Sequence, residues 1–243
     1  HTKLSQVMCI PVPDGVAAAD AASSFVNPLT ALGMTETMRL EGHSAIVHTA
    51  AASNLGQMLN RLCQADGIPL VNVVRRNEQA DLLRAAGAEH VVVSSADSFA
   101  DDLTVAITAT GATLAFDAIG GGEQVDTLLA SMEKASSAGQ AFSRYGSDTH
   151  KQVYIYGGLD RSATTLRRTY GMSWGVGGWL LTPFLGRVGF ERMAELQARV
   201  AAEITTTFAS GYADTISLDD MLDPVVAKAY SAQATGEKRL VTP

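Results

Sequence analysis

The chain has 243 residues, enough for one large domain or two small ones, and its 47% hydrophobic and 18% charged residues argue against disorder. A formal net charge of -7 disfavours nucleic acid and anionic membranes as partners, although a buried anionic cofactor needs only local donors. Two cysteines exclude a disulfide framework or Cys-rich zinc site, and five histidines lack metal-binding spacing, so we predict no metal site. Neither a membrane-spanning run nor a signal peptide is found, and the reduced-thiol composition indicates the cytoplasm.

Short apolar segments alternate with helical patterns along most of the chain. After an extended, proline-broken opening and an alanine-rich helical stretch (17–40), the predicted strands are 44–49, 70–74, 90–93, 114–118 and 153–156. The predicted helices between them are 55–65, 78–86, 99–108 and 123–133. Short β-branched strands, each followed by a helix, are typical of a parallel sheet covered on both faces. We therefore expect a doubly wound, Rossmann-like α/β fold that binds ligands at the carboxyl ends of its strands.

The pattern changes after Gly158. A polar, basic segment (161–170) and a run rich in glycine and tryptophan (171–189) precede predicted helices at 191–210 and 224–232 and a terminal extended run, 238–241. The apolar run 174–181 predicts that Gly171–Leu185 lies in an interface between two copies of the chain, because tryptophan is enriched in interface cores and glycine allows close backbone approach. The alternative is that both tryptophans are buried within one subunit or face another domain.

An arginine pair closes the second predicted strand. Arg75 and Arg76 follow the apolar run Leu70–Val74, and Arg75 lies 19 residues after Gly56. In a nucleotide-binding βαβ unit, the residue about 20 positions past the glycine turn reads the adenosine ribose. An acid there accepts a hydrogen bond from a free 2′-hydroxyl, whereas arginine suits a 2′-phosphate. The pair therefore predicts NADPH binding; the alternative is that it merely caps a strand end in solvent.

The turn that should hold the pyrophosphate is degraded. The segment Ala50–Gly56 lacks the GxGxxG pattern, but its small residues still permit close backbone approach, and the following helix can present free N–H groups to phosphate. Ser53 or Asn54 can cap that helix or donate to phosphate. The run Gly120–Gly122 also follows a strand, but it comes too late in the alternation, so we interpret it as the loop after the fourth strand.

Catalytic machinery is hard to find in this sequence. No GxSxG elbow, GxxxxGK[ST] loop or Cys–His signature occurs, and no tyrosine has a lysine four residues later. The last absence disfavours short-chain dehydrogenases, whose acid–base pair is YxxxK. We therefore assign no catalytic residue within this chain and expect the isolated chain to be inactive.

Taken in order, these segments resemble the cofactor-binding part of the medium-chain dehydrogenase/reductase superfamily, in its zinc-independent branch of quinone oxidoreductases and trans-2-enoyl-thioester reductases. The resemblance covers nearly the whole chain and is carried by the segments 7–26, 27–31 (NPLTA), 52–57 (ASNLGQ), 73–76 (VVRR), 82–90 (LLRAAGAEH), 156–159 (YGGL), 178–180 (GWL) and 235–238 (TGEK). Residues 135–151 look like an insertion whose role the sequence does not indicate. In this family, a catalytic domain precedes the cofactor-binding part that the chain resembles. The chain itself begins at His1 and not at methionine.

The resemblance implies a cofactor site, a domain organisation and a partner. The implied NADPH-binding residues are Asn27, Ser53, Asn54, Leu55, Gly56, Arg75, Arg76, Tyr156, Gly157, Gly158, Leu159, Trp179 and Lys238. Residues 1–26 would be the exit strand and linker of a catalytic domain, 27–234 the dinucleotide-binding domain, and 235–243 a segment returning to the catalytic domain. The parent enzyme would form a homodimer and transfer hydride from NADPH to a quinone or an activated C=C substrate.

Two other functions stay open at this point. A non-catalytic NADPH-binding sensor or scaffold module is compatible with the lack of catalytic residues. A methyltransferase with a similar sheet is the second alternative, but it would need an acidic ribose reader where this chain has arginine.

Overall fold

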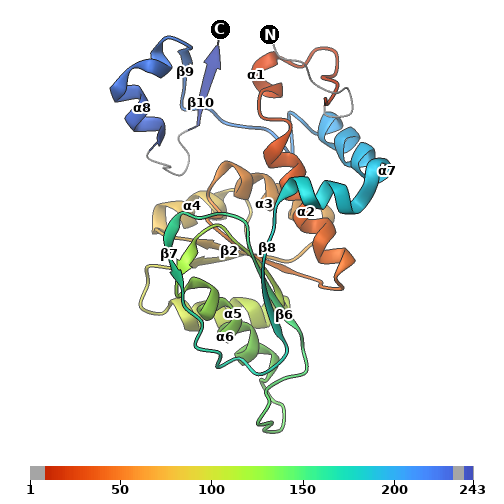
Figure 1. Cartoon of the computed structure of the whole chain (residues 1–243), viewed down its shortest axis with the longest axis vertical. Helices are drawn as coiled ribbons and strands as arrows, with labels where there is room; N and C mark the ends of the chain where they lie inside the picture. The colour runs from red at the N-terminus through yellow and green to blue at the C-terminus, as the bar shows by residue number, and fades with distance from the viewer. Residues whose placement is uncertain (1–8, 232–237, 243) are drawn as a thin grey trace. The chain divides into compact units, whose positions relative to one another are not determined.

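The computed structural model describes residues 9–231 and 238–242, which belong to two compact units (Figure 1). The larger unit comprises Met34–Ala52 and Cys63–Leu180. The smaller unit comprises His1–Gly33, Ser53–Leu62 and Leu181–Pro243. The larger unit holds the whole central sheet, so it also holds the sheet edge at which a ligand is expected.

The central sheet has six parallel strands in the spatial order β3-β2-β1-β4-β6-β8. The chain lays down three strands on one side of the sheet and then returns to place β4 on the other side of β1. The topological switch point therefore lies between β1 and β4. This arrangement confirms the predicted doubly wound α/β fold. The strands are β1 (Ile46–Thr49), β2 (Leu70–Val74), β3 (His90–Val93), β4 (Leu114–Asp117), β6 (Lys151–Ile155) and β8 (Trp174–Gly178).

Helices of the larger unit cover both faces of the sheet. Two of them, α5 (Phe99–Thr110) and α6 (Gln124–Ser136), pack on one face, and α4 (Asn77–Ala85) packs on the other (Figure 1). Successive strand residues point to opposite faces, so Val92 joins the first core while Val91 and Val93 pack against the second. The first core also takes alternate residues of the inner strands, among them Val47, Val71, Ala115 and Val153.

Two helices contain residues of both units. Both α2 (Val26–Leu40) and α3 (Asn54–Asp66) begin in the smaller unit and end in the larger one. The smaller unit also contains α1 (Ala18–Ala21), α7 (Leu181–Ala202), a 3-10 turn η2 (Asp220–Leu222), α8 (Pro224–Ser231) and a parallel strand pair, β9 (Asp214–Ser217) with β10 (Arg239–Thr242).

Two predicted elements were wrong. The helix predicted over 191–210 is α7, which begins at Leu181 and ends at Ala202; Gly189 interrupts it with a φ of 80° that few other residues tolerate. The expected loop Gly120–Gly122 is a short strand, β5, paired with β7 (Asp160–Thr164). Pairing with a distant segment decides both strands, so local pattern could not predict them. The predicted opening at residues 1–8 and the closing residues 232–237 lie outside the described residues.

Candidate functional site: the carboxyl edge of the sheet

Seven of the predicted cofactor residues lie in the larger unit, in loops that follow the carboxyl ends of its strands. Arg75 and Arg76 follow β2, the run from Tyr156 to Leu159 follows β6, and Trp179 follows β8. Because all six strands are parallel, these loops emerge from the same edge of the sheet. The structure therefore brings the predicted ribose-reading and nicotinamide-side residues to one edge.

Tight backbone geometry marks the turn after β1. Ala50 has a φ of 51°, in the left-handed region where a residue with a side chain is strained. The next two residues, Ala51 and Ala52, are buried against the core beside α4. A larger side chain at either position would collide with that core. This turn therefore has the close packing of a nucleotide-binding turn, although glycine is absent from its first positions.

The arginine pair has its backbone anchored and its side chains exposed. Gln79 Oε1, in the first turn of α4, accepts hydrogen bonds from the backbone N–H groups of Arg75 at 3.0 Å and Arg76 at 3.1 Å. Neither guanidinium has a hydrogen-bond or salt-bridge partner within residues 9–231 and 238–242, and both residues are exposed. The structure therefore holds two unneutralised positive charges at the end of β2, where a 2′-phosphate would be read.

A histidine–tyrosine pair lies near the middle of the same edge. His48 in β1 is fully buried, and its Nε2 lies 2.7 Å from Tyr156 Oη, with the two rings stacked at 5.7 Å between centroids. Burial lowers the pKa of His48 to about 3, so its ring is neutral at physiological pH. Burial, assisted by the Asp117 carboxylate, raises the pKa of Tyr156, so its hydroxyl stays protonated.

A second polar network joins β1 to the loop after β4. Thr49 Oγ1 donates to Asp117 Oδ1 at 2.7 Å and accepts from the Ala118 backbone N–H at 2.8 Å. Asp117 Oδ2 accepts from Gly120 N at 2.8 Å. The two hydrogen bonds of Thr49 cross the switch point, so they hold the carboxyl ends of β1 and β4 together there.

The loop after β6 approaches the loop after β4 very closely. A Cβ at Gly157 would lie 2.7 Å from the Ala118 carbonyl oxygen, whereas a Cβ at Gly158 would meet nothing within 4 Å. Leu159 donates its backbone N–H to the same Ala118 oxygen at 3.1 Å. The glycine at 157 therefore permits the contact between the two loops, and Gly158 and Leu159 are exposed beyond it.

Sequence reasoning missed His48, Thr49 and Asp117, which support the predicted residues. All three are polar side chains with at most 1% exposure inside short apolar strands. That pattern was a usable signal, because a buried polar residue in a strand needs a partner. The partners, however, lie on other strands and could not be identified from spacing.

The other six predicted residues lie in the smaller unit: Asn27, Ser53, Asn54, Leu55, Gly56 and Lys238. Ser53 Oγ accepts from the Gly56 backbone N–H at 3.1 Å, which makes Ser53 the predicted cap of α3. The Asn54 side chain donates to Ser210 Oγ at 2.9 Å, and Lys238 Nζ donates to Ser23 Oγ at 2.6 Å. Burial lowers the pKa of Lys238.

Trp179 occupies a structured position after β8. Its indole Nε1 donates to Thr37 Oγ1 at 3.1 Å, and its ring meets Phe116 edge to face at 5.9 Å. Its backbone N–H continues the ladder with β6 by donating to the Ile155 carbonyl at 3.0 Å. The side chain thus packs within the larger unit. This supports the alternative that this tryptophan packs inside one subunit and not between two copies of the chain.

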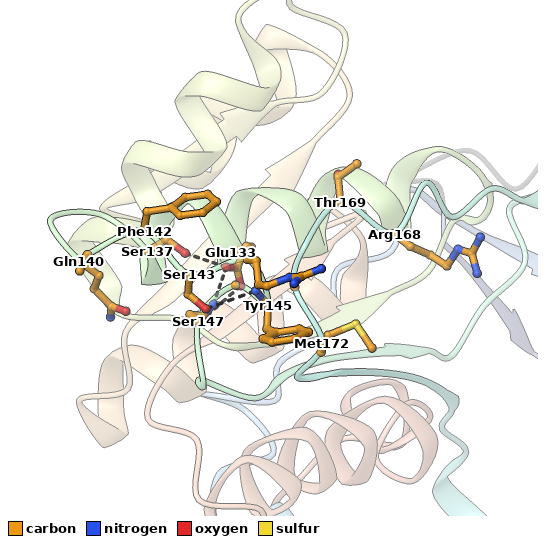
Figure 2. A pocket seen from close by; sticks show the side chains of 14 residues that line it. Glu133, Ser137, Gln140, Phe142, Ser143, Tyr145, Ser147, Arg168, Thr169 and Met172 are labelled. Carbon is orange, nitrogen blue, oxygen red and sulfur yellow. Dashed lines mark hydrogen bonds between the residues drawn. The ribbon is translucent and has the colours of Figure 1, made fainter.

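A cavity of about 800 Å³ lies elsewhere, beside the segment interpreted as an insertion (Figure 2). Residues 140–147 and 168–172, which precede β6 and β8, form most of its wall, so it belongs to the amino ends of these strands. Figure 2 shows Glu133, Ser137 and Ser147 linked by hydrogen bonds at this cavity. Ligands of doubly wound sheets bind at the opposite edge, so we do not assign the cofactor to this cavity.

In the described part of the chain, no group of three His, Cys, Asp or Glu side chains is placed to hold a metal ion. Likewise, none of the helices in that part has the length and hydropathy needed to cross a bilayer. Cys63 is buried and Cys9 is exposed, and neither forms a disulfide within the described residues.

Comparison with curated proteins gives partial matches to reductases, while no family model matches the chain. The chain is 32% identical over 93 residues to the mitochondrial enoyl-[acyl-carrier-protein] reductase of Homo sapiens, covering 36% of this chain and 25% of that protein. The Arabidopsis thaliana protein of the same name is 36% identical over 80 residues, covering 31% of this chain and 21% of the relative. The chain therefore matches about a quarter of the length of these relatives.

Solved structures match over nearly the whole chain. A proposed NADPH:quinone reductase from Mesorhizobium loti has a TM-score of 0.78 at 27% identity, covering 97% of this chain and 63% of its own. The resemblance to medium-chain dehydrogenase/reductases is confirmed. Quinone oxidoreductase from Escherichia coli, solved with NADPH, has a TM-score of 0.70 at 18% identity and coverages of 96% and 67%. A mutant enoyl thioester reductase from Candida tropicalis has a TM-score of 0.66 at 17% identity, with coverages of 95% and 63%. Because the Escherichia coli and Candida tropicalis proteins are only 18% and 17% identical to this chain, their likeness to it concerns the fold alone.

Proposed function

We propose that the chain is the NADPH-binding domain of an oxidoreductase that reduces a quinone or an activated C=C bond. The observation that carries the proposal is the exposed, unneutralised pair Arg75 and Arg76 at the end of β2. The similar proteins described above are named as quinone or enoyl reductases, and two of the matching structures were solved with NADPH. When bound, NADPH supplies the hydride, while the protein contributes binding and orientation.

The roles proposed for individual residues follow the strand ends. Arg75 and Arg76 hold the 2′-phosphate, and Ser53–Gly56 line the pyrophosphate at the start of α3. Tyr156–Leu159 lie on the nicotinamide side. Asn27, Trp179 and Lys238 complete the proposed set on the strength of the family resemblance. No catalytic residue is assigned, and residues 27–234 are the proposed dinucleotide-binding domain, between a linker and a returning segment that both belong to a catalytic domain.

Two further parts of the proposal concern the setting of the enzyme. The chain is proposed to act as a homodimer paired through β8, which forms one edge of the central sheet. Its location is proposed to be cytoplasmic, which the low cysteine content, two in 243 residues, and the lack of a disulfide between them support.

The proposal is tested by titrating NADPH and NADH into the chain and following the change in nicotinamide fluorescence. A charge-assisted phosphate contact contributes about 1.5–3 kcal/mol, so wild type should bind NADPH roughly 10- to 100-fold more tightly. The double variant Arg75→Ala/Arg76→Ala should lose this preference and keep its NADH affinity. Arg84→Ala is the matched control, because Arg84 is an exposed arginine of α4 paired with Asp81 at 3.2 Å. Equal affinities of wild type for the two cofactors would contradict the proposal.

A further inference from the structure

The hydrogen bond between Tyr156 and His48 joins two segments that are not neighbours in the sheet. His48 lies in β1, Tyr156 follows β6, and β4 runs between them. Adjacent strands are about 4.8 Å apart, so the phenol must reach across the carboxyl end of β4 to contact β1. The Tyr156 hydroxyl therefore lies at the β1–β4 switch point, where doubly wound sheets bind their ligands.

The surroundings of His48 indicate which ring nitrogen carries the hydrogen. Its Nδ1 is buried and has no hydrogen-bond partner in the described ranges 9–231 and 238–242. A neutral imidazole has one N–H donor and one acceptor nitrogen. Because a buried donor without an acceptor is rarer in proteins than an acceptor without a donor, the hydrogen belongs on Nε2. Nε2 then donates to Tyr156 Oη, and the phenolic hydrogen is not used in this bond.

The phenolic hydrogen also finds no acceptor on the neighbouring carboxylate. Asp117 Oδ1 accepts from Thr49 Oγ1 at 2.7 Å and from Ile119 N at 3.2 Å, and Oδ2 accepts from Gly120 N at 2.8 Å. The structure gives the Tyr156 hydroxyl one partner, His48, within the described residues. Tyr156 thus holds an available donor at the switch point, and the hydrogen bond from His48 restricts where that donor points.

We propose that Tyr156 donates a hydrogen bond to the carboxamide oxygen of the nicotinamide, and that His48 is a positioning residue that aims this donor. The inference rests on the proposed NADPH binding. An amide oxygen is a good acceptor, and a hydrogen bond to it restricts the rotation of the nicotinamide ring about its ribose. The contact is made only with a ligand that carries a nicotinamide, so it is separable from recognition of the 2′-phosphate.

The first test compares two ligands that share the 2′-phosphate. NADPH carries the nicotinamide. The compound 2′,5′-ADP carries the adenosine with a 2′-phosphate and a 5′-phosphate, but it has no nicotinamide. Calorimetric titration of Tyr156→Phe should show NADPH affinity reduced on the order of threefold to tenfold, the effect of one hydrogen bond, with 2′,5′-ADP affinity unchanged. Tyr154→Phe is the matched control: it removes a hydroxyl on β6 that bonds to Glu41 at 3.0 Å, and it should change neither affinity.

The second test separates positioning by His48 from general support of the fold. His48→Leu should lower NADPH affinity as much as Tyr156→Phe, and the double variant should lose no more than either, because both remove the same contact. His48→Gln should restore most of the affinity, since its amide can donate to Tyr156 Oη. Nitrogen NMR of the imidazole at neutral pH should show Nε2 protonated and Nδ1 unprotonated.

Each outcome bears on one of the two proposals. Equal losses for NADPH and 2′,5′-ADP in Tyr156→Phe, or unchanged NADPH affinity, would overturn the role of Tyr156 and leave NADPH binding intact. A hydrogen on Nδ1 of His48 would overturn the positioning role. If wild type bound neither ligand, the proposed function itself would fail, and the assignment of Tyr156 with it.

Discussion

At the scale of single residues, the missing side chain at Gly157 decides how closely two loops meet. A Cβ there would lie 2.7 Å from a backbone oxygen of Ala118, and backbone can move aside less easily than a flexible side chain. Gly157→Ala is therefore expected to destabilise the chain by about 1–3 kcal/mol, the usual effect of overpacking. Urea unfolding followed by tryptophan fluorescence measures the change.

The neighbouring glycine provides the control for this prediction. A Cβ at Gly158 would meet nothing within 4 Å, so Gly158→Ala should stay within about 0.5 kcal/mol of wild type, as exposed substitutions usually do. If the two variants unfolded at the same urea concentration, the close approach of the loops after β4 and β6 would not be a stabilising feature.

At the scale of elements, one buried ion pair ties the start of β6 to the end of α6. Lys151 Nζ, fully buried, donates to Glu133 Oε2 at 2.5 Å and also to Ser147 Oγ at 3.1 Å and the Thr149 carbonyl at 2.9 Å. Glu133 accepts two further hydrogen bonds from Ser147 and one from Ser137. The segment interpreted as an insertion is therefore fixed at its base by a fully connected polar network.

This network predicts a pH dependence of stability. Burial alone would raise the pKa of Glu133, but the hydrogen bonds from Lys151, Ser137 and Ser147 lower it to about 2. A carboxyl whose pKa is lower in the folded state contributes stability above its ordinary value of 4.5, and that stability is lost as pH falls toward 2. Wild type should therefore lose stability to urea between pH 5 and pH 3.

Glu133→Gln isolates this contribution. At pH 6 the variant should be less stable by about 3–5 kcal/mol, because Lys151 would remain buried without its counter-ion. Its stability should also change less between pH 5 and pH 3 than that of wild type. Asp101→Asn is the control, because it breaks an exposed ion pair with Lys134 at 2.9 Å. An unchanged slope in Glu133→Gln would show that other carboxyls determine the acid sensitivity.

At the scale of the whole molecule, the proposed dimer pairs through β8, the strand at one edge of the central sheet. Trp179 N and the Ser173 carbonyl both bond to β6, so the N–H groups of Val176 and Gly178 point away from it. An exposed parallel edge of this kind invites pairing with another copy. The Val176 side chain packs against the core, so a charge there would disturb the fold and would not test pairing.

Gly178→Pro is the sharper test of the proposed dimer. Proline removes the outward-facing donor at this position, where a Cβ would meet nothing within 4 Å. Light scattering at concentrations well above micromolar should give the mass of two chains for wild type and of one chain for the variant. Gly211→Pro is the control, because a Cβ at Gly211 would also meet nothing within 4 Å. A monomeric wild type would refute pairing through β8.

The sequence by itself determined the order and type of most elements. The predicted bounds of β2 and β3 are those of the structure, because short β-branched runs between turn signals have a local cause. Spacing alone placed Arg75 and Arg76 at the end of β2, and the exposed side chains there agree with that prediction. The identity and binding roles of the remaining site residues came from family resemblance, and their cofactor contacts stay predictions.

Only the tertiary structure decided which distant residues meet. His48 and Tyr156 are 108 residues apart, and their hydrogen bond depends on β4 being placed between β1 and β6. The pairing of β5 with β7 and the interruption of α7 at Gly189 likewise escaped prediction. Local propensity acts over a few residues, whereas strand order and register follow from packing of the whole sheet. The sequence therefore predicted the scaffold and its arginine pair, and the fold supplied the polar contacts at the switch point.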